Sequence, residues 1–409
     1  MVTEKLSLEG HLLDDGTLAK ALATIDKHGV SFEVRRFRFG AGAEDASLVE
    51  LSLTAPDLAA MRRALDACAP LGASFSLEEV TLAKVEVDGV LPEGFYSTTN
   101  FTTFVLVDGK HVPVDALEMD VAIRVVRDAG KTMAMTCPMH RVKKGDDVVV
   151  GSAGVRVLPT EQEQQDTDEF AFMKSEVSSE RPKRRMIAHA ADAIRLAKKD
   201  GRRVLLVGGP AIVHSGSAPL LASLIAHGWI DVLFAGNALA AHDIEAAMLG
   251  TSLGVDLAKG APVPHGHSNH LRTINRVRRV GSIANAVRDG LITSGVMHAC
   301  VTRPIPFVLC GSIRDDGPLP DVISDTLAAV DAMRENVRGV GVALIVATTL
   351  HGVATGNILP AHVKTYCVDS SADTVIKLTD RGTHQAIGLV TDCEFFLKEL
   401  CACLGALPA

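Results

Sequence analysis

From residue 184 to the C-terminus, short apolar runs alternate with stretches of helical spacing. The apolar runs have the length and composition of buried strands, and most precede a helical segment. This alternation predicts an α/β domain over residues 184–409, with a Rossmann-like parallel sheet and helices on both faces. The expected strands are Val204–Val207, Val232–Ala235, Phe307–Cys310, Ala343–Ala347, Thr365–Val368 and Ile387–Val390. Expected helices include Leu220–His227, Ala241–Leu249, Thr273–Asp289, Pro320–Glu335 and Glu394–Leu400.

Two smaller regions precede this domain. Residues 1–110 predict an α+β unit in the order strand, helix, strand, strand, helix, strand, which is the split βαβ pattern. Its first helix is expected at Thr17–His28 and its last strand at Ser74–Val87. Residues 111–160 lose helical periodicity and predict a small β-rich, barrel-like segment. The polar stretch 160–183 then indicates a linker or an exposed helix.

The composition excludes several classes of function. The 41 Lys and Arg against 49 Asp and Glu give a net charge of −8, and aromatic residues are 4% of the chain. A nucleic-acid-binding protein would need clustered basic residues, and a base-stacking platform would need aromatic ones. No apolar run reaches the length of a membrane span, and the first residues do not resemble a signal peptide. We therefore expect a cytoplasmic protein whose eight cysteines are reduced thiols.

The expected strands end in residues that suit a nucleotide. Glycine permits close approach to the backbone, while hydroxyl, amide and carboxylate groups can bind ribose and phosphate. Each end taken alone is also compatible with ordinary turn chemistry. The six ends are Gly208-Gly-Pro-Ala, Gly236-Asn-Ala, Gly311-Ser-Ile-Arg-Asp-Asp-Gly, Thr348-Thr-Leu-His-Gly, Asp369-Ser-Ser and Thr391-Asp-Cys. Together they predict a nucleotide-type ligand at one edge of the sheet.

The usual dinucleotide fingerprint is absent from this half of the chain. Arg338-Gly-Val-Gly-Val-Ala comes near G-x-G-x-x-G but lacks the third glycine. An NAD site would therefore use a different set of loops. Asp369 at a strand end can accept ribose hydroxyls and would repel a 2′-phosphate, which favours NAD over NADP.

Three histidines in a polar loop leave several possibilities open. His265, His267 and His270 lie in Pro264-His-Gly-His-Ser-Asn-His, where the H-x-H spacing can place two imidazoles on one metal ion. Polar contact with a substrate and simple solvent exposure are equally compatible with this composition. Cys393 at another strand end has no fixed histidine neighbour in sequence, so a nucleophilic thiolate is the less favoured interpretation.

Four long sequence motifs in the C-terminal half carry a family resemblance. They are Gly208-Gly-Pro-Ala-Ile-Val-His-Ser-Gly, Leu233-Phe-Ala-Gly-Asn-Ala-Leu-Ala-Ala-His-Asp-Ile-Glu, Gly266-His-Ser-Asn-His and Gly311-Ser-Ile-Arg-Asp-Asp-Gly-Pro-Leu-Pro-Asp. Together they resemble the NAD-dependent ornithine cyclodeaminases of the LOR/SDH (lysine-oxoglutarate reductase/saccharopine dehydrogenase) conserved-region type, which are distinct from the μ-crystallin-like type. The similarity extends over nearly the whole chain.

The resemblance implies a cofactor domain similar to that of deoxyhypusine synthase, which binds NAD without the usual glycine fingerprint. Cofactor domains of this kind often pair across subunits, so we expect a homo-oligomer. The composition already argues against a nucleic-acid or membrane partner, and we expect no bound metal. Carried onto matching positions, the implied NAD contacts fall on the strand ends identified above. They are Asn237, Ala238, Asp316, Thr348, Thr349, Leu350, His351, Asp369, Asp392 and Cys393.

The implied reaction converts L-ornithine to L-proline and ammonia, with a hydride lent to NAD+ and recovered in each turnover. From chemistry and position, we expect Asp316 to orient the substrate amine or accept its proton, and Asn269 and His270 to contact substrate or move protons. Three other functions remain open. They are an NAD(P)-dependent amino-acid dehydrogenase of the saccharopine type, a metal-dependent hydrolase using His265, His267 and His270, and a non-catalytic amino-acid sensor.

Overall fold

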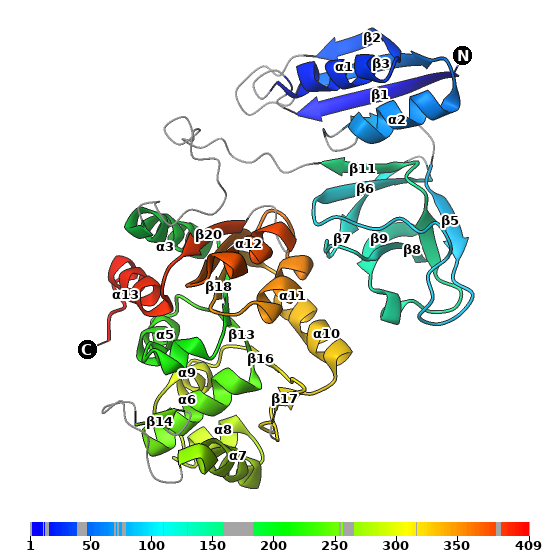
Figure 1. Ribbon diagram of the computed structural model, residues 1–409. Coiled ribbons are helices and arrows are strands. Elements are labelled where there is room, and N and C mark those ends of the chain that lie inside the picture. Colours follow the sequence, from blue (N-terminus) through cyan, green and yellow to red (C-terminus); the bar gives the residue numbers. More distant parts are fainter. Residues whose placement is uncertain are drawn as a thin grey trace. The chain divides into compact units, whose positions relative to one another are not determined.

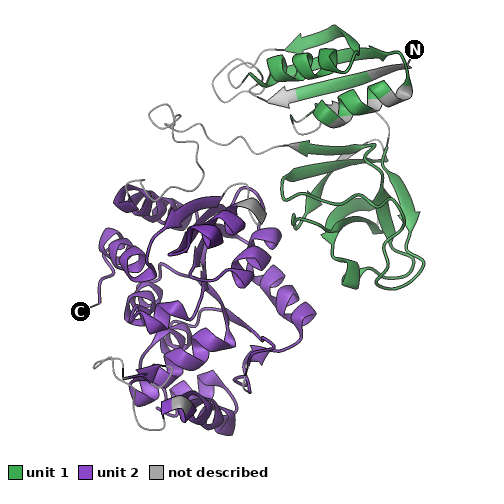
Figure 2. Ribbon diagram, in the orientation of Figure 1, with its two compact units in different colours: residues 1–163 green, residues 164–409 purple. Residues whose placement is uncertain are grey.

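The computed structural model describes residues 2–10, 12, 16–38, 47–68, 71, 73–75, 79–108, 110–128, 130–158, 183–252, 255–256, 266–315, 317–381 and 386–408. The chain divides into two compact units, residues 1–163 and 164–409 (Figure 2). Of the polar stretch 160–183, all but Lys183 lies outside the described residues. In the described ranges, no helix is long and apolar enough to cross a membrane.

The first unit begins with the predicted split βαβ fold (Figure 1). Its four described strands lie in the order β2-β3-β1-β4, and every pairing in this sheet is antiparallel. Alternate residues of β3 are buried, which is the pattern of a sheet covered by helices on one face only. The elements are β1 (Val2–Gly10), α1 (Thr17–Lys27), β2 (Ser31–Arg38), β3 (Ser47–Ala55), α2 (Leu58–Cys68) and β4 (Ala73–Phe75).

The β-rich region of the same unit is a mixed sheet of seven described strands, in the order β11-β6-β7-β9-β8-β10-β5. Strand β5, the first of these seven along the chain, lies within the stretch Ser74–Val87 that is expected to form one strand. That expectation is wrong, because this stretch contributes β4 to the first sheet and β5 to the second. The strands are β5 (Thr81–Lys84), β6 (Thr102–Val107), β7 (Lys110–Asp115), β8 (Ala122–Asp128), β9 (Lys131–Cys137), β10 (Asp147–Val150) and β11 (Val155–Leu158).

The second unit contains the predicted parallel sheet. Its seven described strands lie in the order β17-β16-β13-β12-β18-β19-β20, and all their pairings are parallel. All six expected strands are confirmed, and β17 is an additional short edge strand. The strands are β12 (Arg203–Gly208), β13 (Val232–Gly236), β16 (Phe307–Cys310), β17 (Val322–Ile323), β18 (Val340–Val346), β19 (Lys364–Asp369) and β20 (Ala386–Val390).

Helices cover both faces of this sheet, as Figure 1 shows. One face packs against α3 (Lys183–Lys199), α4 (Ala211–His214), α5 (Ala218–Ala226), α6 (Asn237–Leu249), α9 (Val296–Thr302) and α13 (Cys393–Leu404). The other face packs against α10 (Thr326–Asn336), α11 (Leu350–Ile358) and α12 (Ala372–Arg381). Because both faces are covered, every residue of β18, which lies beside the central strand β12, is buried.

Two expected helices differ from the observed ones. Thr273–Asp289 is interrupted at Gly281, whose φ of 89° ends α7 (Asn269–Val280) before α8 (Ile283–Arg288) begins. Pro320–Glu335 contains β17 before its helix, and α10 begins only after Asp325, whose side chain accepts a hydrogen bond from the backbone N–H of Ala328.

Candidate functional site

The carboxyl ends of the parallel strands meet at one edge of the second unit's sheet. From the central strand β12, the chain moves outward through β13 and β16, and then returns to β18 on the other side of β12. In open α/β sheets, ligands bind outside the carboxyl ends of the strands at such a switch in direction. The ends of β12 and β18 therefore form the centre of the candidate site.

The backbone at this switch is too closely packed for side chains. A Cβ atom on Gly209 would lie 1.7 Å from the carbonyl oxygen of Ala347, the residue that follows β18. A Cβ atom on Gly208 would lie 2.9 Å from Cδ1 of Leu239 on α6. Ala347 itself has a φ of 52°, a left-handed conformation that is strained for alanine. The two glycines thus allow the chain after β12 to pass against the chain after β18.

His351 connects the ends of two strands that flank β12. It is the second residue of α11, which follows β18, and its Cε1 would lie 2.9 Å from a Cβ atom on Gly236 at the end of β13. Burial lowers the pKa of His351, although the nearby carboxylate of Asp315 acts in the opposite direction. The imidazole is therefore mainly neutral at pH 7, so it can both donate and accept a hydrogen bond.

The two helices nearest the switch begin without a side-chain cap. The N-cap residues of α6 and α11 are Gly236 and Thr349, and in the described structure neither side chain caps its helix. The first turn of each helix also has no acidic residue. The N-terminal amide groups of such helices, together with the positive end of the helix dipole, favour an anion such as a phosphate.

The predicted cofactor contacts near β12 and β18 differ in exposure. The side-chain oxygen of Asn237 accepts a hydrogen bond from the backbone N–H of Leu319 at 3.0 Å, so this buried amide holds the segment that follows β16. Ala238 and Thr348 are partly buried, and Thr349 is exposed. Leu350 is 79% exposed, which leaves the first residue of α11 open to a ligand.

Acidic residues occupy the next two strand ends. Asp369 ends β19, and its Oδ1 accepts a hydrogen bond from the backbone N–H of Ser371 at 2.8 Å. Asp392 caps α13 by accepting from the backbone N–H of Glu394 at 2.7 Å. A carboxylate already neutralises the N-terminus of α13, so this end of the site suits hydroxyl groups better than phosphate.

Cys393 lies among packed groups. It is 7% exposed, its Sγ lies 3.4 Å from the Ser215 hydroxyl, and its thiol donates to the Ala211 carbonyl at 3.8 Å. Burial raises the pKa of this thiol, which disfavours the thiolate form. These contacts indicate a packing role between α13 and α4.

The arrangement of these groups fits a dinucleotide. Uncapped amide groups at the starts of α6 and α11 flank the central strand and suit a pyrophosphate. Asp369 and Asp392 lie two and three strands away from β12 and suit ribose hydroxyls.

The structure brings Asn269 and His270 into a second group of polar residues. The Asn269 amide donates to the Thr251 hydroxyl at 3.0 Å. The His270 ring lies 6.2 Å from the His242 ring, and the His242 ring lies 4.9 Å from that of His214, measured between ring centroids. We call His214, His242, His270, Asn269 and the residues bonded to them the imidazole cluster.

The imidazole cluster contains functional candidates that sequence reasoning missed. Glu245 on α6 is fully buried, accepts a hydrogen bond from Thr251 and forms another with His242, while His214 bonds the Ser252 hydroxyl at 2.8 Å. One signal was available: α6 is apolar around most of its surface but contains His242, Asp243 and Glu245. Ionisable residues in a helix that is buried on all sides need polar partners, so they are candidates for a functional role.

Some expected site residues cannot be placed. Asp316 and His265 lie outside the described residues, as does the side chain of His267. Among the side chains that the structure does describe, no group of three or more His, Cys, Asp or Glu is arranged to hold a metal ion. All eight cysteines are described, and none of them is paired in a disulfide.

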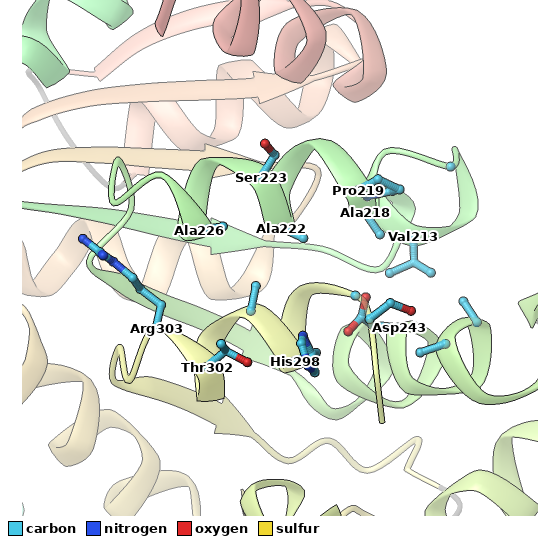
Figure 3. Close-up of a pocket in the computed structure, with 16 residues that line it drawn as sticks. Val213, Ala218, Pro219, Ala222, Ser223, Ala226, Asp243, His298, Thr302 and Arg303 are labelled. Carbon is cyan, nitrogen blue, oxygen red and sulfur yellow. The ribbon is translucent and has the colours of Figure 1, made fainter. Parts of the chain in front are cut away.

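A separate cavity of about 870 Å³ lies on the helical layer (Figure 3). Small residues of α5, such as Ala222, line one side, and His298 and Thr302 of α9 line the other. Asp243 borders it but turns its carboxylate to the start of α9, where both oxygens accept backbone hydrogen bonds. The cavity lining includes none of the predicted site residues.

Three family models match consecutive parts of the chain. Residues 186–400 match the arginine dihydrolase ArgZ-like C-terminal Rossmann fold, and residues 102–187 match the first region of the same C-terminal part. Residues 3–101 match the LOR/SDH bifunctional enzyme conserved region. The first match alone covers more than half of the chain.

Relatives of known name resemble the chain over nearly its full length. Ornithine cyclodeaminase of Methanothermobacter thermautotrophicus is 47% identical over 401 residues, which are 98% of this chain and 97% of the relative. The crystal structure of a LOR/SDH protein from Methanococcus maripaludis is 46% identical with a TM-score of 0.76, covering 80% of this chain and 99% of that one. AgrE of Nostoc sp., solved as a ternary complex with ornithine and NAD+, is 37% identical with a TM-score of 0.54, covering 99% of this chain and 57% of that one.

Proposed function

The chain belongs to the LOR/SDH conserved-region family of ornithine cyclodeaminases, and from this membership we propose that it converts L-ornithine to L-proline and ammonia. The proposal rests mainly on similarity to ornithine cyclodeaminases along almost the entire chain. The sheet edge with its uncapped helices and acidic strand ends supports it independently, because the reaction needs a dinucleotide.

NAD is the cofactor of this ornithine-converting enzyme, in agreement with the ternary complex of the relative AgrE. When bound, NAD+ accepts a hydride from the substrate and returns it, so the reaction has no net redox change. The amides at the starts of α6 and α11 would hold the pyrophosphate, and Asp369 would hold ribose hydroxyls. His351, mainly neutral at pH 7, would hydrogen-bond the ligand between the ends of β13 and β18.

Besides binding NAD, the protein must transfer protons from and to the two amino groups of ornithine. The δ-amine of ornithine is charged at neutral pH and must lose a proton before its nitrogen can join the α-carbon, and the departing α-nitrogen must gain one. We assign the contact with the reacting amine to Asp316, and substrate contact or proton transfer to Asn269 and His270. Holding the two ends of ornithine together makes ring closure intramolecular, which favours it strongly.

Replacing Asp316 with asparagine is expected to lower kcat by about 100-fold, because the neutral amide no longer holds the charged amine of the substrate in its reactive position. The far-UV circular dichroism spectrum should not change. Asp331→Asn is a matched control, since Asp331 pairs with Arg334 on α10 at 2.8 Å and should keep wild-type turnover. Wild-type turnover in the Asp316 variant would remove this residue from the mechanism.

Replacing Asp369 with alanine is expected to weaken NAD binding by at least about tenfold, because hydrogen bonds to a charged group contribute about 1.5–3 kcal/mol. Binding of NADP should fall less, since the substitution also removes a negative charge that would face the 2′-phosphate. Calorimetric titration of both cofactors measures the two affinities. Asp373→Ala, which removes an exposed carboxylate from the first turn of α12, should leave both unchanged, and equal losses for NAD and NADP would contradict the ribose assignment.

Isotopic labelling tests the proposed reaction. Ornithine labelled with 15N at the δ-nitrogen should give labelled proline and unlabelled ammonia, because the α-nitrogen is the one released. Mass spectrometry of both products provides the measurement. Label in the ammonia, or no proline at all, would contradict the proposal.

A further inference from the structure

A chain of hydrogen bonds in the imidazole cluster ends at a buried carboxylate. The Asn269 amide donates to the Thr251 hydroxyl at 3.0 Å, and the Thr251 hydroxyl donates to Oε1 of Glu245 at 2.8 Å. Oε2 of Glu245 lies 3.1 Å from Nδ1 of His242, one turn earlier on α6. Helix α6, strand β14 (Thr251–Ser252) and helix α7 therefore each supply part of this network.

The direction of these bonds determines which nitrogen of His242 carries a proton. The amide nitrogen of Asn269 can only donate, so the Thr251 hydroxyl accepts there and directs its own proton to Glu245. Oε1 of Glu245 thus accepts from Thr251, and in the ionised form of Glu245 its Oε2 accepts as well. Nδ1 of His242 must then be the donor, which leaves Nε2 unprotonated in the neutral ring.

Only the histidine of this pair can meet a ligand. The His242 side chain retains 11% of its exposure, whereas Glu245 retains none. Among the described side chains, the rings of His214 and His270 also flank His242. The neighbouring Asp243 does not take part, because its carboxylate accepts from the backbone of Val296 and Met297.

The pair lies close to the cofactor edge of the sheet. Helix α6 begins at Asn237, directly after β13, and His242 follows five residues later. At a rise of about 1.5 Å per residue, His242 is about 8 Å along the helix from its uncapped start. A substrate held against a ligand at that start can extend to His242.

We propose that Glu245 is a positioning residue that holds His242 as the base for the substrate's amines, an inference that rests on the proposed function. Nε2 of His242 takes the proton from the δ-ammonium group, so one N–H bond breaks and another forms without any change in oxidation state. The carboxylate of Glu245 stabilises the resulting imidazolium. The same proton then passes to the departing α-nitrogen, which leaves as ammonia and returns His242 to its starting form.

The test is Glu245→Gln, which keeps the shape of the side chain. Because the Thr251 hydroxyl continues to donate to one end of the glutamine, the NH2 group must face His242. Nδ1 then becomes the acceptor, and the proton moves to Nε2. We expect kcat to fall by at least about 100-fold, the range of general-base catalysis, while the Kd for NAD stays within about twofold.

Two further readouts separate positioning from a structural role. 15N NMR of labelled histidine should show a change of the His242 tautomer in Glu245→Gln. The acidic limb of the kcat/KM profile should move to lower pH in this variant's residual activity, because the imidazolium loses its carboxylate partner. Glu399→Gln is the matched control. It removes a carboxylate of α13 that pairs with Arg184 of α3 at 3.2 Å, and it should match wild type in kcat, NAD affinity, His242 tautomer and pH profile.

These measurements distinguish failure of the proposed function from failure of the positioning role. If Glu245→Gln does not fold, His242→Gln, which can still donate to Glu245, must show the same loss in kcat. Wild-type protein that makes no proline refutes the proposed function, while the tautomer measurement still reports on the pair. Active wild type together with a variant within about threefold of its kcat, or with an unchanged pH profile, overturns the positioning role of Glu245.

Discussion

Replacing Gly209 with alanine is expected to destabilise the second unit by at least about 3 kcal/mol and to abolish NAD binding. The new Cβ atom would lie 1.7 Å from the carbonyl oxygen of Ala347 and 2.6 Å from its carbonyl carbon. Both are backbone atoms, and the Gly209 N–H already donates to the Val346 carbonyl at 2.9 Å, so the clash cannot be relieved by a rotamer change. The segments after β12 and β18 must separate, and the cofactor edge is built from these segments.

Urea unfolding followed by tryptophan fluorescence measures this loss, because Trp229 is the chain's one tryptophan and packs against the core of the second unit. Gly216→Ala is the control. Gly216 also lies after β12 but has open space around its Cβ position, and its φ of 79° limits the cost to about 1–2 kcal/mol. A Gly209→Ala protein with wild-type stability and NAD affinity would contradict the close packing of these segments.

Replacing Asp243 with alanine is expected to destabilise the same unit by about 3 kcal/mol at about pH 4.5. Asp243 is 1% exposed, and its two oxygens accept from the backbone N–H groups of Val296 and Met297, both at 2.8 Å. Alanine leaves both donors at the start of α9 without a partner, together with a small void. Each unsatisfied buried donor adds to the cost.

This effect should depend on pH. Burial raises the pKa of Asp243 from 3.8 to about 6, although the two backbone hydrogen bonds oppose the shift. Because the folded-state pKa lies above the unfolded one, the stability due to this group is fully present below about pH 3.8 and is lost as the pH rises through about 6. The advantage of wild type over Asp243→Ala should therefore shrink by about 2 kcal/mol between about pH 4.5 and about pH 7.5.

The fluorescence of Trp229 during urea unfolding at both pH values gives this difference. Asp289→Ala is the control, because the Asp289 carboxylate is 46% exposed beside Arg288 and should contribute little at either pH. A difference between wild type and Asp243→Ala that is the same at both pH values would show that Asp243 does not titrate in this range.

The architecture could be predicted from sequence because local patterns agree with the global fold. The buried strands of the second unit, such as Val340–Val346, are short apolar runs, and only a parallel sheet covered on both faces buries such runs fully. Hydrophobic periodicity does not predict the end of a helix that depends on one residue, or the division of a stretch into two strands that pair in different sheets. Gly281 ends α7 through its backbone conformation, and β4 and β5 belong to different sheets although the sequence around them alternates without a clear division.

The candidate site likewise has one part that could be predicted from sequence and another that could not. The strand ends could be located from sequence, because a parallel sheet must bring Asn237, Thr348 and Asp369 to one edge. The imidazole cluster could not, because His214, His242 and His270 are far apart in the chain and meet only through the packing of α4, α6 and α7. The sequence predicts Asn269 as a substrate contact, but its link to Glu245 depends on Thr251, which no motif identifies.

A cofactor that is regenerated in each turnover is the central claim, and a single assay tests it directly. Purified protein is given L-ornithine in large excess over NAD+, and proline, ammonia and NADH are measured together over time. We expect equal amounts of proline and ammonia, many times the amount of NAD+ supplied, with NADH never exceeding the enzyme concentration. NADH that rises mole for mole with ornithine consumed, and a reaction that stops when NAD+ is exhausted, would contradict this claim.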